Sequence, residues 1–435
     1  MQMPSKLMNR NFFLLWQGQT VSRLGIQAFE IAMLFWIKHA TESATLMGLM
    51  MMLSNLPVIV LGPIGGTFAD RHSRRKIILI SDALNGIAIL SLAGLLFLAP
   101  DATEVILVWL FVVSLCGAVT ISFFSPAISA AIPDLVPKDS VSTANSLFQS
   151  STQISVFIGQ GIGGMLFRLL GAPVLFLING LTYLFSAASM LFIAIPQTLS
   201  HDARDHPSPS AEFKHDVVDG FRYICRRDGL RELVFVSAFL NFFTVPIIVL
   251  LPFFVEDFLK ASVDWYGFLI ASYGIGSVIG YIFAGAFRLT GTVRYRVMAA
   301  IILLESLGYG LLGIANSPIT ALALALIGGA AGGFVTIIIT TLLQVTTPDD
   351  MRGRVFGLLS TVSGSLAPIA MGLTGIVADA LGRNIPLIYL SCSAIMVVLT
   401  MVVLTRKEFR HFLADEHSEL SAPTIAPEIL SQVGR

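Results

Sequence analysis

The chain has 435 residues, of which 55% are hydrophobic and only 12% are charged, and its mean hydropathy is +0.81. A soluble globular domain is about 25% charged, so this composition indicates an integral membrane protein. The 27 basic and 27 acidic residues cancel, which excludes a protein that binds nucleic acid through a large net positive charge.

Twelve apolar stretches are long enough to cross a membrane as helices. A spanning helix needs about 20 predominantly apolar residues, and these runs are too long and continuous for the alternating strands of a membrane barrel. The sequence therefore predicts an all-α membrane protein. The expected spans are residues 12–37, 45–69, 76–99, 104–125, 143–168, 172–196, 231–255, 264–288, 297–316, 318–343, 355–381 and 384–404.

The distribution of Lys and Arg predicts that both termini are cytoplasmic. Basic residues accumulate in cytoplasmic loops. With the N-terminus inside, the inside segments hold 22 of the 27 Lys and Arg residues. We therefore expect a multi-pass protein of the cell membrane, the inner membrane where there are two, with an even number of spans.

The first span carries one polar stripe. Gln19, Arg23, Gln27 and Glu30 follow at spacings of four, four and three, which places them on one face of a helix. Charged residues near the middle of a span are costly and normally face the bundle interior or a wet cavity. We expect this face to line a cavity, with Arg23, Gln27 and Glu30 as candidates for coupling to protons or substrate. The alternative is that Arg23 and Glu30 pair with one another or with neighbouring carbonyl groups.

A charged cluster follows the second span in the stretch GGTFADRHSRRK, residues 65–76. Asp70 sits at the end of a span, where a carboxylate can pair with Arg71 or Arg74 or cap the N-terminus of a neighbouring helix. The alternative is that the cluster is only a cytoplasmic anchor of basic residues.

Other polar residues inside the spans are weaker candidates. Glu305 lies near mid-depth of its span. It is a candidate for proton or substrate coupling, and the alternative is that it only supports the structure. Asp82 and Asn85 are expected to support the charged loop. Four amides line a cavity or bond between helices, namely Asn55, Gln153, Gln160 and Asn241.

A polar stretch divides the chain into two halves of six spans. We predict an N-terminal bundle at 1–196, a cytoplasmic linker with an interfacial helix at 197–230, a C-terminal bundle at 231–404 and a cytoplasmic tail at 405–435. Polar, proline-bearing composition is typical of a linker.

The two halves resemble each other at an offset of 211 residues. Pro137 then meets Pro348, and Asp139 meets Asp350. Duplicated six-helix halves are typical of secondary transporters, which bind substrate near the midplane between the halves. We therefore expect two pseudo-symmetric bundles. The repeated loop of the second half contains the candidates Asp350, Arg352, Gly353 and Arg354.

The loop after the second span resembles the signature of the major facilitator superfamily. The matching residues are Gly66, Asp70, Arg71, Arg74 and Arg75, and the stretches after the fourth and tenth spans are similar to the macrolide-efflux and siderophore-exporter branch. The resemblance implies the major facilitator fold. It also implies that this loop is a gate that locks the ends of adjacent helices in one conformation and releases them in the other.

From this we expect a secondary transporter that exports amphipathic drug-like, macrolide-like or siderophore-like molecules by alternating access, with proton antiport. The alternative is a flippase for lysophospholipids or other lipids on the same fold. We expect a monomer whose partners are its substrate, protons and membrane lipids. The sequence has neither a phosphate-binding GxxxxGK[ST] loop nor an HExxH-type set, so we expect no enzyme activity, catalytic residue, cofactor or metal.

Overall fold

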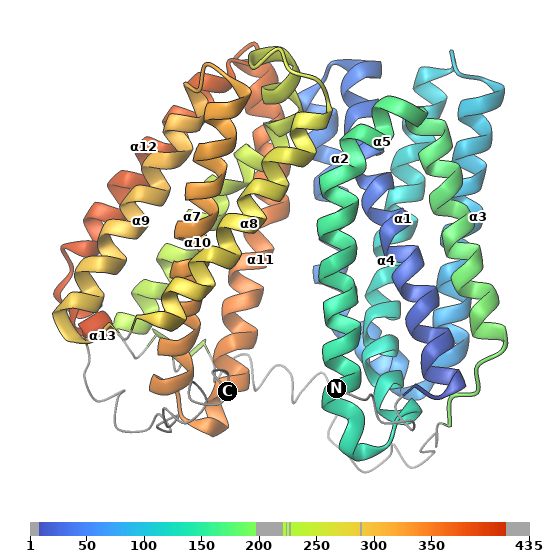
Figure 1. The fold of residues 1–435 in the computed structure, drawn as a ribbon, viewed down its shortest axis with the longest axis horizontal. Helices are drawn as coiled ribbons and strands as arrows, with labels where there is room; N and C mark the ends of the chain where they lie inside the picture. Colours follow the sequence, from blue (N-terminus) through green and yellow to red (C-terminus); the bar gives the residue numbers. More distant parts are fainter. Residues whose placement is uncertain (1–7, 197–220, 223, 226–227, 288, 415–435) are drawn as a thin grey trace, which may run out of the picture.

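A computed structural model describes residues 8–414 apart from 197–220, 223, 226–227 and 288. Every regular element in this part of the chain is a helix (Figure 1). Eleven helices are long and apolar enough to cross a membrane, and one of them contains two spans. The predicted all-α fold with twelve transmembrane segments is therefore confirmed.

The first half of the molecule contains six spans in five helices. Its longest helix breaks at Gly171, where φ is 73°. Only glycine adopts this backbone conformation without strain, so the chain turns there and the two arms become separate spans. The helices are α1 (Arg10–Thr41), α2 (Ala44–Arg71), α3 (Arg74–Leu98), α4 (Thr103–Leu135) and α5 (Val141–Leu191), with a 3-10 turn η1 (Lys138–Ser140) before α5.

The second half contains six further spans and a short terminal helix. Its first span ends in one π-helical turn, η2 (Phe254–Phe258). The helices are α7 (Asp228–Phe253), α8 (Asp264–Ala286), α9 (Gly291–Gly313), α10 (Pro318–Thr346), α11 (Asp349–Ala380), α12 (Ile385–Leu404) and α13 (Lys407–Ala414).

Helix α4 is longer than the sequence predicted. We expected its span to end at residue 125, before Pro126, but the helix continues to Leu135. Ala127, Ile128 and Ala131 are buried in the apolar core of the first half. This packing stabilises the extra turns, although proline removes a hydrogen bond from a helix interior.

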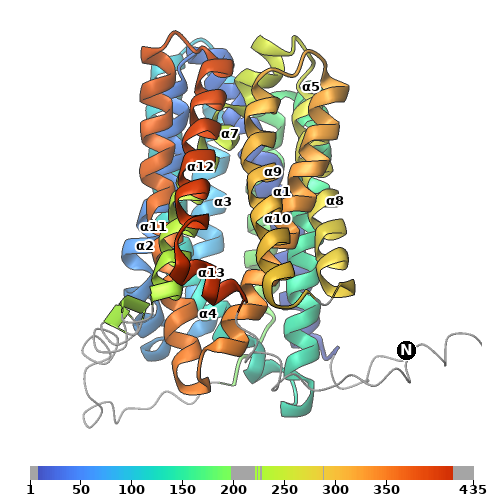
Figure 2. The same ribbon diagram turned by 90° about the vertical axis from the view of Figure 1, so that its left-hand side faces the viewer.

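The two halves meet at one end of the molecule, at the top of Figure 1. Figure 2 shows the molecule from the side, with the second half in front of the first. We call the end where the halves meet the closed end: α1, α3, α9 and α11 end there, and α2 and α4 begin there. A large apolar cluster joins residues of both halves on this side, including Phe35, Met47, Phe254 and Tyr266.

At the opposite end, which we call the open end, each half has its own apolar cluster. Phe12, Ile78 and Ile132 belong to the cluster of the first half. Leu233 and Met298 belong to that of the second half. The halves are therefore packed together on the side of the closed end and have separate cores on the side of the open end.

The short helix α13 lies against the second half, within the residues that we predicted as a tail. Phe409 and Leu413 are buried there, and the guanidinium of Arg294 donates to the carbonyl oxygen of Leu413 at 2.6 Å. Most of the predicted linker, 197–220, and the rest of the predicted tail, 415–435, lie outside the described residues. The boundaries of the two bundles stay a prediction.

Candidate functional site

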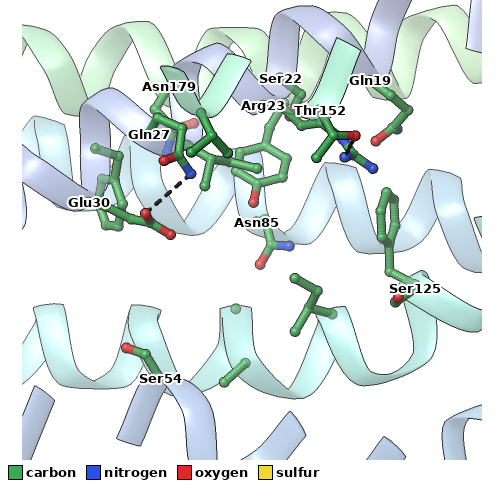
Figure 3. Close-up of a pocket in the computed structure, with 18 of the residues that line it drawn as sticks. Gln19, Ser22, Arg23, Gln27, Glu30, Ser54, Asn85, Ser125, Thr152 and Asn179 are labelled. Atoms are coloured by element: carbon green, nitrogen blue, oxygen red, sulfur yellow. Dashed lines mark hydrogen bonds between the residues drawn. The ribbon is translucent and has the colours of Figure 1, made fainter. Parts of the chain in front are cut away.

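A cavity of about 1070 Å³ lies between the helices (Figure 3). Its lining comes almost entirely from α1 to α5 of the first half; the second half contributes Ile248 and Tyr266. The lining combines hydroxyl and amide groups with apolar side chains such as Phe29 and Ile89. Such a cavity suits an amphipathic molecule, because apolar walls bury its body and a few polar groups orient it.

The polar stripe of α1 faces this cavity. Gln19, Arg23, Gln27 and Glu30 all line it. The side-chain amide of Gln27 donates to Oε2 of Glu30 at 3.2 Å, and Nη1 of Arg23 donates to the hydroxyl of Thr152 on α5 (Figure 3). Arg23 and Glu30 lie about 10.5 Å apart along the helix axis, at 1.5 Å per residue. Each has a neutral hydrogen-bond partner.

A second carboxylate in the cavity wall was underestimated from the sequence. Asp82 on α3 is 1% exposed and lines the cavity. Its Oδ2 accepts hydrogen bonds from Gln19 at 3.1 Å and from the hydroxyl of Ser186 at 2.7 Å. It therefore links α1, α3 and the second arm of α5. The sequence places Asp82 only as a support of the loop, although its position in an otherwise apolar span is a signal for a role in the cavity.

The four amides predicted to line a cavity or to bond between helices divide into two groups. Asn55 and Gln160 line the cavity, whereas Gln153 and Asn241 are not among its lining residues. The coupling candidate Glu305 is not among them either. Glu305 instead accepts a hydrogen bond from the hydroxyl of Tyr309, one turn along α9, at 3.2 Å.

The charged loop between α2 and α3 lies at the open end. Asp70 and Arg71 are exposed at the end of α2, and Gly66 has open space around its Cα. Arg74 forms an ion pair with Asp134 on α4. Arg75 donates to the carbonyl oxygens of residues 190 and 191, at 3.1 and 2.7 Å. The last two arginines thus tie α3 to α4 and to the end of α5.

The candidate loop of the second half, which repeats the loop before α5 at the offset of 211 residues, lies at the start of α11. Nε of Arg352 donates to the carbonyl oxygen of Gln344 on α10 at 2.7 Å, and Arg354 contacts the sulfur of Met351 at 3.7 Å. Gly353 has open space around its Cα. The side chain of Asp350 lies outside the part of the chain that the structure describes.

An ionic cluster joins the halves at the closed end. Lys38 at the end of α1 is only 5% exposed. Its Nζ lies 2.6 Å from Oε2 of Glu256 and 2.9 Å from Oδ1 of Asp257, both on η2. Nε2 of His39 lies 2.9 Å from the same oxygen of Glu256. The cluster links the first and seventh spans of the molecule.

A second contact at the closed end joins α11 to the start of α2. The carboxylate of Asp379 accepts from the hydroxyl of Ser43 at 2.8 Å, from the backbone N–H of Ala44 at 3.1 Å and from that of Thr45 at 2.8 Å. The first N–H groups of a helix have no intrahelical partner and carry partial positive charge. Asp379 therefore caps a helix of the other half.

Two further ion pairs reinforce this end. Nη2 of Arg168 lies 3.2 Å from Oδ2 of Asp264. Nη1 of Arg383 lies 3.7 Å from Oε2 of Glu42 and also donates to the carbonyl oxygen of the same residue at 2.6 Å. All of these contacts join residues of the first half to residues of the second. Within the described residues, no three His, Cys, Asp or Glu side chains come together as a metal site.

Comparisons with known proteins agree with this architecture. A family model described as "Transmembrane secretion effector" matches residues 4–434. Macrolide efflux protein A of Streptococcus pyogenes is 25% identical over 378 residues, which cover 86% of this chain and 90% of that protein. The uncharacterized MFS-type transporter YfiS of Bacillus subtilis is 26% identical over 431 residues, 96% of this chain and 99% of that one.

A siderophore exporter and a solved structure are also similar. Enterobactin exporter EntS of Escherichia coli is 24% identical over 396 residues, 90% of this chain and 91% of that protein. The crystal structure of the nucleoside transporter NupG superposes with a TM-score of 0.70 at 13% identity, covering 92% of this chain and 100% of that chain. At this identity the structural similarity shows the fold alone.

Proposed function

Because the chain belongs to the major facilitator superfamily of membrane transporters, in the transmembrane secretion effector family, we propose that it exports amphipathic small molecules by alternating access with proton antiport. The observation that carries the proposal is the cavity of about 1070 Å³, which is polar on the α1 face and covered by inter-half contacts at the closed end. The names of similar exporters, for macrolides and for enterobactin, support the direction of transport.

We assign the open end to the cytoplasm. The charged loop with Asp70, Arg71, Arg74 and Arg75 is at this end, and basic loops are retained in the cytoplasm. The described conformation is then the inward-facing one, in which the cavity receives substrate from the cytoplasm or the inner leaflet.

Export then requires the two ends to exchange roles. The contacts of Lys38 and Asp379 across the closed end must break, and the open ends of α2 and α11 must approach. Helices α2 and α11 already pack against each other, so they offer a surface on which the halves rock. We propose that Asp70 and Arg71, exposed at the end of α2 in this conformation, hold the other conformation.

Glu30 is the proposed site of proton coupling. Its carboxylate lies in the cavity and is held by the neutral amide of Gln27. Protonation removes a negative charge from the cavity, and release of the proton restores it. A conformational change that alters the solvation of this carboxylate, or its distance from the Arg23 guanidinium, changes its affinity for the proton.

The test is uptake of rhodamine 6G or radiolabelled erythromycin into inverted vesicles, with and without a pH gradient. We expect Glu30→Gln to keep substrate binding but to lose the acceleration by the gradient. Glu104→Gln, the same change at the exposed start of α4, is the matched control and should behave like the wild type. A Glu30→Gln protein that still accelerates with the gradient would exclude Glu30 as the coupling site.

A further inference from the structure

Arg23 carries a positive charge in the cavity without a carboxylate partner. Among the described residues no acidic group forms an ion pair with it, and its guanidinium donates a hydrogen bond to the neutral hydroxyl of Thr152. That hydroxyl donates its own proton to the carbonyl oxygen of Phe148 at 2.9 Å, so it faces Arg23 only as an acceptor. The guanidinium has five N–H donors, and most of them remain available to the cavity.

The guanidinium is also held in a fixed position. Its central carbon lies 4.5 Å from the centre of the Phe148 ring, and this ring is buried at 9% exposure. Stacking on an aromatic face orients the planar group and leaves its N–H edge free. An oriented edge of this kind matches the two oxygens of a carboxylate.

The two carboxylates that line the cavity are engaged elsewhere. Asp82 accepts from Gln19 and Ser186, and Glu30 accepts from Gln27. No charge of the cavity wall therefore neutralises Arg23 at short range. A bound anion would remove this imbalance, and the attraction is strong where water is excluded.

Neighbouring amides add donors beside Arg23. Gln149 and Asn145 line the cavity on α5, one and two turns before Thr152, respectively, on the same helical face. Both side chains are exposed to the cavity. They supply N–H groups but no second positive charge, so the subsite compensates one negative charge and suits a monoanion better than a phosphate dianion.

We infer that the cavity contains an anion subsite, formed by Arg23 with Asn145 and Gln149, that binds a single carboxylate on an otherwise apolar solute. The inference rests on the proposed export function and adds the charge of the preferred substrates. The apolar body of the solute lies along Ile121 of α4, which lines the same cavity and is 45% exposed.

The experiment compares 1-pyrenebutyric acid with its methyl ester, which has the same apolar body but no charge. Binding to the full-length protein in phosphatidylcholine nanodiscs is measured by fluorescence, against empty nanodiscs. We expect the acid to bind about tenfold or more tightly than the ester, since hydrogen bonds between charged groups are worth this factor or more. Equal affinity of acid and ester in the wild type would overturn the inference without any variant.

Two variants locate the effect. Arg23→Gln should reduce the affinity for the acid to that for the ester and leave the ester unchanged, and Arg23→Lys should restore part of the preference. Arg10→Gln, the same change at an exposed position of α1 outside the cavity, should retain it fully. An unchanged acid preference in Arg23→Gln would contradict the assignment.

Two further measurements distinguish a free carboxylate solute from a lipid headgroup, and failure of the anion subsite from failure of the proposed export function. If phosphatidylglycerol in the nanodisc reduces the acid affinity about tenfold or more, the subsite binds a lipid headgroup and the inference of a free solute is wrong. If rhodamine 6G is transported in vesicles but the wild type shows no acid preference, the anion subsite fails and the export function stands. If the acid preference is present but the vesicles take up neither rhodamine 6G nor 1-pyrenebutyric acid, the export function fails and the subsite stands.

Discussion

Replacement of Asp379 by Ala should shift the molecule toward the conformation in which the closed end is open. The carboxylate of Asp379 accepts three hydrogen bonds, from Ser43, Ala44 and Thr45 at the start of α2. These bonds cross between the halves, so they exist only while the closed end is closed. The substitution therefore removes stabilisation from one conformation and not from the other.

The magnitude follows from the three bonds. Loss of a capping side chain costs about 1 kcal/mol, and loss of a negative charge at a helix N-terminus costs about 0.3 to 1 kcal/mol. With the hydroxyl bond the total is about 2 kcal/mol, which is roughly a 30-fold shift in the equilibrium. If the other conformation is populated at about 1%, it should rise to about a quarter of the molecules.

The assay is a distance distribution between two spin labels. Asp101 and Asn316 are exposed on opposite halves at the closed end. Each is replaced by cysteine and labelled, in a background without the three native cysteines. Asp379→Ala should enlarge the fraction at the longer distance, and Asp379→Asn should do so less, because the amide keeps one acceptor oxygen. Asp139→Ala, the same loss of charge at the open end, is the control. An unchanged distribution in Asp379→Ala, or an equal shift in the control, would refute the reasoning.

Three further changes test other parts of the structure. Lys38→Ala leaves Glu256 and Asp257 without their shared cation. We expect a lower melting temperature and, as for Asp379→Ala, a larger fraction of molecules at the longer label distance. No change in either measurement would show that the ionic cluster does not stabilise the closed end. Asp70→Asn should strongly lower the transport rate while surface expression is retained. A normal transport rate would show that the loop only fixes the membrane orientation and is not a gate. A cysteine at position 73 should be protected from an impermeant thiol reagent in intact cells while one at position 262 reacts, and the reverse pattern would invert the proposed orientation.

The sequence predicts the fold and part of the site for a clear physical reason. Each span, and the polar stripe of α1, is recognised within one continuous stretch of sequence. The spacing of residues in that stretch therefore places Arg23 and Glu30 on one helical face before any packing is known. The contact between Lys38 and Glu256 joins residues 218 apart in the sequence. No local pattern marks such a pair, because it forms only when the two halves meet.

Asp82 and the end of α4 could not be predicted from the sequence for a different reason, which is that both depend on neighbouring helices. Asp82 lies only eight residues from the start of α3, so its depth could not be separated from the loop without the position of Gln19 on a neighbouring helix. The extension of α4 beyond Pro126 depends on burial of Ile128 and Ile132. Tertiary packing overrides the local preference of proline to end a helix.

The unequal lining of the cavity has a consequence for how such a protein diverges. Nearly every side chain that faces the cavity comes from the first half, and the second half contributes Ile248 and Tyr266. The closed-end contacts, in contrast, need residues from both halves. Selection for a new compound can therefore act on the first half alone while the inherited contact surface is retained, and a hybrid chain should take its preference for compounds from the parent of its first half.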